Sequence, residues 1–187
     1  GMLYANTESS GDIYRSPDGS HWTRVFDGSH GSIGCGMTVF NGELYAINYR
    51  NSANDHGLIM RSPDGLTWET VYDSGSSSMY LREIITYNGK IYAFAIIQES
   101  NSARMFSSED GSSWDIVEVP NRYFRGHVWD GYLWLGSVRD AGSSGEGGVW
   151  RYDGNTFTQA LTGDTKYFTN IKDLNGDLFA STSNGWK

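Results

Sequence analysis

Short stretches in which apolar and polar residues alternate extend along the whole chain, and glycine-containing turns separate them. In the second block of this kind we expect strands at about residues 34–40, 43–49, 57–62 and 67–72. Alternation with a period of two residues is typical of strands that bury one face. No amphipathic stretch accumulates helix-forming residues. The pattern therefore predicts an all-β protein with essentially no helix.

Two motifs recur in one register along the chain. Copies of the first motif begin at Ile13, Ile59, Met105 and Val149, which are 46, 46 and 44 residues apart. The second motif is an Asn-Gly or Asp-Gly pair followed by an apolar strand, and its glycines are Gly42, Gly89, Gly131 and Gly176. Two motifs that keep the same spacing indicate a genuine internal repeat.

Each motif has a physical interpretation as a turn. An Asn-Gly pair between apolar runs favours a two-residue hairpin, because both residues must reach positive φ. In the first motif the aspartate can accept hydrogen bonds from amides of its own turn, and the next glycine supplies left-handed geometry. Each repeat then has four strands: A before the Asn-Gly turn, B after it, C before the aspartate and D near the following aromatic residue. A four-stranded unit of this period predicts a β-propeller.

The first motif resembles the Asp box of the bacterial neuraminidase repeat family, within the sialidase-like superfamily. The resemblance implies a structural, turn-forming role for the matching residues, with one residue fewer between Asp and Trp than in the family pattern. We expect the tryptophans that end the motif, Trp22, Trp68 and Trp114, to be buried at equivalent positions. The matching residues are Ser16, Asp18, Gly19 and Trp22; Ser62, Asp64, Gly65 and Trp68; Ser108, Asp110, Gly111 and Trp114; and a degenerate copy at Asp153, Gly154 and Phe157.

The repeats fall near residues 3–28, 29–75, 76–119, 120–164 and 165–187 of one β-propeller domain or propeller fragment. We expect three complete blades of four antiparallel strands and two partial ones, which favours five blade positions. The chain opens with a B strand at Leu3 and is expected to stop inside a fifth C strand near Trp186. A four-bladed ring, completion by another copy through open blade edges, and a longer gene product are the alternatives.

Composition and charge narrow the range of partners. The chain has 24 glycines and 12 tyrosines, as short strands and tight turns require. A formal charge of −8 disfavours nucleic acid and anionic membrane surfaces, and no apolar run is long enough for membrane insertion. The lone Cys35 is expected to be a small buried side chain, and we expect no metal and no cofactor. Family resemblance favours an extracellular or periplasmic location.

The residues that differ between repeats mark the candidate ligand site. Aligned on the Asn-Gly turns, they lie where the A strands begin, on the propeller face opposite the Asp boxes. Arginines there can hold a carboxylate with two hydrogen bonds, and tyrosines can stack on sugars. The competing interpretation is a set of ordinary polar channel residues or an Arg82–Glu83 salt bridge. The candidate ligand-binding residues are Tyr80, Arg82, Glu83, Arg122, Tyr123, Arg125 and Tyr167, and nearby loops add His30, Arg50, His56, Arg139 and Asp140.

Three functions follow from these features. The favoured hypothesis is a non-catalytic binding or scaffold propeller that recognises an acidic glycan or another small anion. The second is a fragment or relative of a sialidase-like glycoside hydrolase. The Phe-Arg-Ile-Pro stretch of that family is absent, so no catalytic residue is assigned. The third is an assembly piece whose partial blades pair with another chain as a homo-oligomer.

Overall fold

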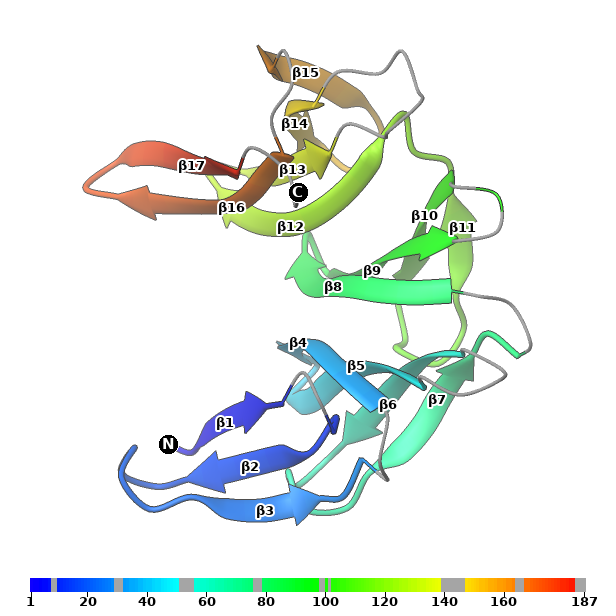
Figure 1. The fold of residues 1–187 in the computed structure, drawn as a ribbon, viewed down its shortest axis with the longest axis vertical. Helices are drawn as coiled ribbons and strands as arrows, with labels where there is room; N and C mark the ends of the chain where they lie inside the picture. The colour runs from blue at the N-terminus through cyan, green and yellow to red at the C-terminus, as the bar shows by residue number, and fades with distance from the viewer. Residues whose placement is uncertain are drawn as a thin grey trace.

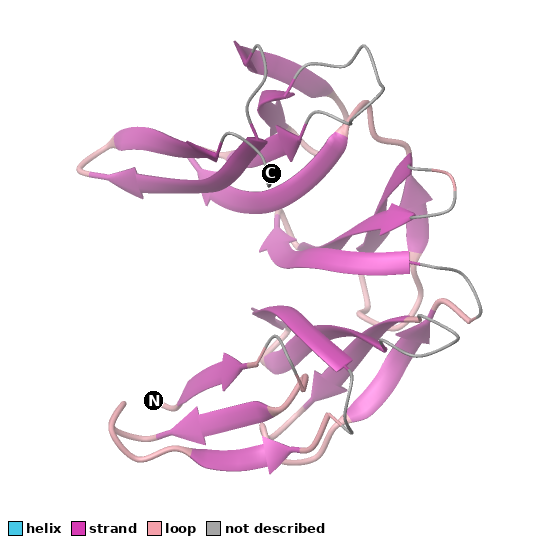
Figure 2. Ribbon diagram, in the orientation of Figure 1, coloured by secondary structure: helices cyan, strands magenta, loops and turns pink. Residues whose placement is uncertain are grey.

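The computed structural model describes residues 1–7, 10–28, 32–50, 56–75, 79–97, 100, 102–138, 147–163 and 167–183. In these residues the chain is all-β and has no helix (Figure 2). None of them forms a helix with the length and apolarity that crossing a membrane requires. The described strands make five separate antiparallel sheets, which follow one another around an open arc (Figure 1).

Three of the sheets have four strands each, arranged in chain order. We call them blades 2, 3 and 4. The first strand of each sheet lines the inside of the arc (Figure 1). Blade 2 contains β4 (Ser32–Phe40), β5 (Glu43–Arg50), β6 (Gly57–Ser62) and β7 (Glu69–Asp73); blade 3 contains β8 (Met79–Tyr87), β9 (Lys90–Ile97), β10 (Ser102–Ser108) and β11 (Asp115–Val117); blade 4 contains β12 (Arg122–Trp129), β13 (Tyr132–Val138), β14 (Gly147–Tyr152) and β15 (Phe157–Gly163).

Two smaller sheets stand at the ends of the arc. Blade 1 contains β1 (Leu3–Asn6), β2 (Ile13–Ser16) and β3 (Thr23–Phe26), which correspond to strands B, C and D of the repeat. Blade 5 contains β16 (Tyr167–Leu174) and β17 (Asp177–Ser183), which correspond to A and B. Three four-stranded sheets and two partial ones were expected from the repeats, whereas five blade positions in a closed ring remain a prediction. The expected fifth C strand near Trp186 lies outside the described residues.

The hairpins between strands A and B form as the Asn-Gly pairs predict. Asn41, Asn88, Asp130 and Asn175 have φ of 51°, 49°, 48° and 54°, and the glycine after each also has positive φ. Two consecutive left-handed residues match the twist of the flanking strands. These four turns therefore set the register of every A–B pair.

The hydrophobic core lies between neighbouring blades. One cluster joins Phe40, Tyr45 and Ile59 of blade 2 to Ile91 and Phe106 of blade 3. A second cluster joins blade 3 to blade 4 in the same way, with Tyr87, Tyr92, Leu133 and Tyr152 among its members. Because each blade buries its faces against its neighbours, the stability of one blade depends on the presence of the next.

The tryptophans of the second and third repeats pack on the preceding blade. Trp68 of blade 2 meets Phe26 of blade 1 edge to face at 6.3 Å between ring centroids, and Trp114 meets Tyr72 at 6.4 Å. Both tryptophans are half-buried. The expectation that Trp22 is buried is wrong, because Trp22 is 43% exposed. Trp22 belongs to blade 1, and no described blade precedes it.

Candidate functional site

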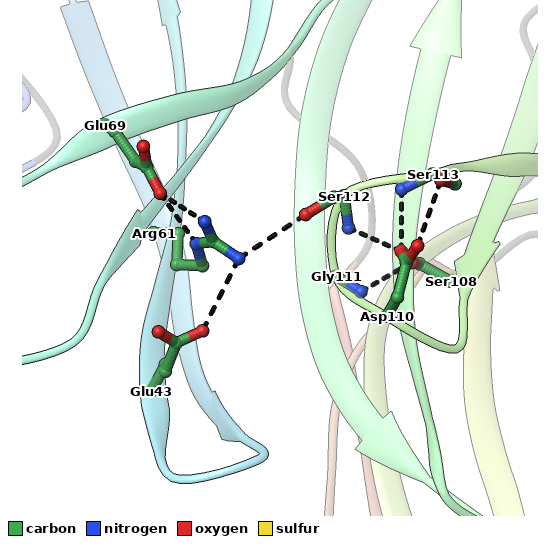
Figure 3. A network of polar contacts seen from close by, with 8 residues as sticks. All are labelled: Glu43, Arg61, Glu69, Ser108, Asp110, Gly111, Ser112 and Ser113. Carbon is green, nitrogen blue, oxygen red and sulfur yellow. Dashed lines mark hydrogen bonds and ion pairs between the residues drawn. The ribbon is translucent and has the colours of Figure 1, made fainter.

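The sequence motif that carries the family resemblance forms four tight turns, which we call the aspartate turns (residues 16–22, 62–68, 108–114 and 153–157). In the third one, Asp110 Oδ1 accepts hydrogen bonds from the amides of Ser112 and Ser113 at 2.7 Å each (Figure 3). Ser108 Oγ donates to Asp110 Oδ1 at 3.0 Å and accepts from the Gly111 amide at 2.7 Å. The carboxylate thus serves its own turn.

The other aspartate turns repeat this bonding. Asp18, Asp64 and Asp153 each accept two amides of their own turn through Oδ1, at 2.7–2.9 Å. These amide hydrogen bonds lower the pKa of all four aspartates, to about 2 for Asp64. One carboxylate oxygen of each aspartate is therefore engaged by its own turn.

The aspartate turns also connect neighbouring blades. Arg61 of β6 lies between Glu43 and Glu69 of its own blade, with Glu43 Oε2 at 3.6 Å from Nη1 (Figure 3). The same Nη1 donates to Ser112 Oγ in the aspartate turn of blade 3 at 3.4 Å. This network is therefore a contact between blades 2 and 3.

The candidate ligand site is built on a bulge that every described A strand shares. Pairing slips by one residue between Gly34 and Gly36, Leu81 and Glu83, Tyr123 and Arg125, and Phe168 and Asn170. The residues just after the slips are therefore equivalent: Gly36, Glu83, Arg125 and Asn170. A bulge redirects a side chain from the regular pleat. One repeat position thus carries a carboxylate in blade 3 and a guanidinium in blade 4.

Glu83 lies between the inner strands of three blades. Its Oε1 would be 3.1 Å from a Cβ at position 36, so the glycine of β4 leaves space for the carboxylate. Its Oε2 is 3.9 Å from Arg125 Nη1, and its side chain is 16% exposed. Burial raises the pKa of Glu83, although Arg125, the amides of Ile84 and Gly126, and Lys172 oppose that rise. A carboxyl group held this way retains its proton more readily than a surface carboxylate.

Two arginines adjoin Glu83. Arg125 Nη1 donates to the Arg82 carbonyl oxygen at 2.6 Å, and the Arg125 side chain is 41% exposed. The Arg82 guanidinium carbon lies 5.6 Å from the centre of the Tyr80 ring, within range of a cation–π contact. Arg125 of β12 thus reaches the Glu83 carboxylate and the Arg82 backbone of β8. The Arg82 guanidinium lies instead near Tyr80, which is 8% exposed.

Tyr123 does not belong to this group. It is 3% exposed and packs against Phe94 at 6.1 Å and Phe157 at 5.8 Å in the core between blades 3 and 4. Its repeat equivalents, Leu81 and Phe168, are core residues as well. The expectation that Tyr123 contacts a ligand is therefore corrected to a packing role.

The remaining sequence candidates divide between described and undescribed positions. Arg122 is half-buried at the start of β12, where its amide donates to Asn121 Oδ1. His56 Nδ1 is bonded to Asp73 at 3.0 Å on the outer part of blade 2, away from the inner strands. The side chains of Cys35, Arg50 and Tyr167, and residues His30, Arg139 and Asp140, lie outside the described part of the chain. Among the described residues, no group of three or more His, Cys, Asp or Glu could hold a metal ion.

Sequence reasoning missed two charged contacts of the inner strands. Lys172 of β16 acts on the Glu83 carboxylate, and His127 Nε2 is bonded to Asp173 Oδ1 at 2.7 Å between β12 and β16. The imidazole holds the pKa of Asp173 below its usual range. These residues lie on the A strands, so aligning whole A strands would have placed them near one another.

Comparison with known proteins supports the architecture. No protein-family model and no curated protein sequence matches the chain. A family 117 glycoside hydrolase from the marine bacterium Zobellia galactanivorans is similar, with a TM-score of 0.53 and 11% identity over 83% of this chain and 56% of that one. An α-L-arabinofuranosidase from Clostridium thermocellum has a TM-score of 0.51 and 15% sequence identity, and the match covers 90% of this chain and 69% of that one. A prolyl endopeptidase has a TM-score of 0.59 and 9% sequence identity, and the match covers 86% of this chain and 24% of that one.

These similarities define the fold of the chain. The fold is of the β-propeller type, and its structural neighbours include propeller glycoside hydrolases. At identities of 9–15% the similarity concerns the fold alone. The chain spans 56% and 24% of the glycoside hydrolase and the endopeptidase, respectively, so the activities of those whole proteins do not transfer to it.

Proposed function

We propose that this chain is a non-catalytic β-propeller that binds an acidic glycan at the bulged starts of its inner strands. The observation that carries the proposal is the contact between the Arg125 guanidinium, which is 41% exposed, and the partly buried Glu83. These residues come from different blades at equivalent repeat positions, where the fold itself requires no charge. The glycan-active propellers among the structural neighbours favour a carbohydrate as the ligand.

The charges at this position favour an anion. Arg125 and Lys172 both act on the Glu83 carboxyl group, and Arg82 precedes Glu83 in the chain, while Lys172 also acts on Asp173. Within a Debye length of about 8–10 Å, these cations act more strongly on a bound anion than charges elsewhere on the chain do. The exposed Arg125 guanidinium offers paired donors to a sugar carboxylate, and a protonated Glu83 donates to a hydroxyl group.

The test uses a glycan array followed by titration calorimetry with the best acidic ligand and its neutral counterpart. Arg125→Ala should weaken binding by about 10- to 100-fold, as loss of a hydrogen bond to a charged group does. Arg151→Ala is the matched control. Arg151 also carries a guanidinium, but it lies over the Tyr132 ring at 4.8 Å on blade 4. Equal affinities for wild type and Arg125→Ala would move the site elsewhere.

A glycoside hydrolase is the second candidate function, and the raised pKa of Glu83 favours it. A carboxyl group that stays protonated can act as the general acid of glycosidic cleavage. Cleavage in most families also needs a second carboxylate across the scissile bond. The structure places Asp173 near the other end of β16, where it pairs with His127. Product release from an acidic oligosaccharide that Glu83→Gln abolishes would favour the enzyme over the binding module.

A further inference from the structure

Blades 2 and 3 each present a pair of large side chains to the blade that follows. The pair is the last residue of strand A and the third residue of strand B, for example Phe40 with Tyr45 and Tyr87 with Tyr92. These four side chains are 0–6% exposed. Tyr45 packs into the cluster shared with blade 3, and the Tyr87 hydroxyl donates to the Gly131 carbonyl of blade 4 at 2.8 Å. We call this the leading face of a blade.

The opposite side of each blade receives that pair. It consists of the second residue of strand B together with the glycine and the tryptophan of the aspartate turn. Tyr45 lies against Gly111 so closely that a Cβ there would stand 2.7 Å from Tyr45 Cζ, and Tyr4 lies against Gly65 in the same way. Ile91 and Leu133, the strand B members, are both 0% exposed. We call this the receiving face.

Both end blades expose one of these faces. In blade 5 the leading-face residues Leu174 and Phe179 are 60% and 55% exposed. In blade 1 the receiving-face residues Leu3 and Trp22 are 52% and 43% exposed, and a Cβ at Gly19 would meet only Leu3 of its own blade within 4 Å. The same repeat positions are buried or half-buried inside the arc and exposed at its ends.

We propose that these two surfaces are the halves of one further blade–blade interface, and that a second copy of this chain docks its blade 5 onto blade 1, head to tail. The interface continues the contact already made between blades 2 and 3 and between blades 3 and 4. It does not depend on the proposed glycan site, whose residues lie on β8 and β12.

A second copy is the occupant that the arrangement supports. Blades 1 and 5 form separate sheets without strand pairing between them, and they stand on either side of the opening of the arc (Figure 1). Each copy therefore carries one leading face and one receiving face, and a partner copy supplies both complements. Contacts between different surfaces are heterologous, so association adds copies in one direction.

Two variants, each blocking one face, test the proposal. Phe179→Asp puts a charge on the leading face, and Leu3→Asp puts one on the receiving face; both positions are more than half exposed, so the fold tolerates the change. Analytical ultracentrifugation of the 187-residue chain from about 1 µM to about 1 mM should detect concentration-dependent oligomers of the wild type. Each variant alone should be monomeric, with association weakened at least about tenfold. An equimolar mixture should form a dimer, because each variant retains the face that the other lacks.

A control variant on another exposed surface separates loss of the interface from a general effect of added charge. Ile116→Asp alters an equally exposed residue, 55% accessible on the outer strand β11, and should associate as the wild type does. Thermal unfolding of all three variants is measured to check that each one folds. A wild type that is monomeric at every concentration, as when one chain closes on itself, overturns the proposal. So does a Phe179→Asp variant that associates normally, or a mixture of the two face variants that stays monomeric.

Discussion

The contact between Gly111 and Tyr45 gives a sharp test of how the blades hold together. Gly111 lies in the aspartate turn of blade 3 with a φ of 75°, and Tyr45 of blade 2 is fully buried against it. A methyl group at position 111 would overlap the Tyr45 hydroxyl and stand 2.7 Å from Cζ. Because Tyr45 is enclosed by the core, it has no free space into which to move.

The cost of Gly111→Ala has two parts. The left-handed backbone alone costs about 1–2 kcal/mol for a residue with a Cβ. Forcing an extra methyl group into packed surroundings adds about 1–3 kcal/mol, so we expect a total of about 2–5 kcal/mol. Gly89→Ala isolates the first part, because Gly89 has a φ of 73° and a Cβ there would meet nothing within 4 Å.

The assay is urea unfolding of the wild type, both single variants and Gly111→Ala combined with Tyr45→Phe. The phenylalanine removes the nearest atom, so the double variant should regain part of the loss, with a coupling of at least about 0.5 kcal/mol. Equal costs for Gly89→Ala and Gly111→Ala, or no coupling with Tyr45→Phe, would refute the inter-blade contact.

Further predictions concern the tryptophans and two kinds of carboxyl group. Trp68 contacts Phe26, so Trp68→Ala should lower the free energy of unfolding by about 2–3 kcal/mol. Trp22 is exposed, so Trp22→Ala should lower it by less than about 1 kcal/mol, and urea unfolding measures both values. Asp64 has its folded pKa lowered to about 2, so its stabilisation is present above about pH 4 and lost toward pH 2, and Asp64→Asn should flatten that part of the acid-unfolding profile. Glu83 has its folded pKa raised above 4.5, so the stability of the wild type should decrease relative to Glu83→Gln as pH rises through the folded pKa, measured by thermal unfolding at each pH. A constant difference between Glu83→Gln and wild type from pH 4 to 8 would contradict the burial of that carboxyl group.

The features that are encoded locally could be predicted from the sequence. Asn41-Gly42 and its equivalents specify hairpins through backbone geometry that few other residues adopt, so the A–B pairs followed from the sequence. The amides that donate hydrogen bonds to Asp18, Asp64 and Asp110 lie within three residues of each aspartate. Such short-range chemistry is independent of what surrounds the repeat.

The features that depend on a neighbouring blade could not be predicted in the same way. Trp22 and Trp68 occupy the same place in the motif, but only Trp68 has a preceding blade to pack on. Tyr123 was misplaced because a strand with a bulge does not alternate regularly on both sides of it. The apolar equivalents Leu81 and Phe168 were the available signal that this position belongs to the core.

The closeness of Glu83 to Arg125 also required the three-dimensional arrangement. Both residues stand six positions before the glycine of the following Asn-Gly or Asp-Gly turn, so they align in the sequence. Their contact, however, depends on how far neighbouring inner strands stand apart. The space that Gly36 leaves for the carboxylate comes from a third blade. Alignment of a repeat can therefore name the residues of such a site, whereas its charge state depends on burial.

The location of a bound acidic oligosaccharide tests the central claim most directly. A crystal structure of the chain with the best acidic ligand from the array should place the sugar carboxylate within hydrogen-bonding distance of Arg125 or Arg82, beside Glu83. The Arg125→Ala crystal, treated identically, should lack the ligand. A ligand lodged instead among Asp18, Asp64 and Asp110, whose carboxylates already accept their own turn amides, would contradict the account.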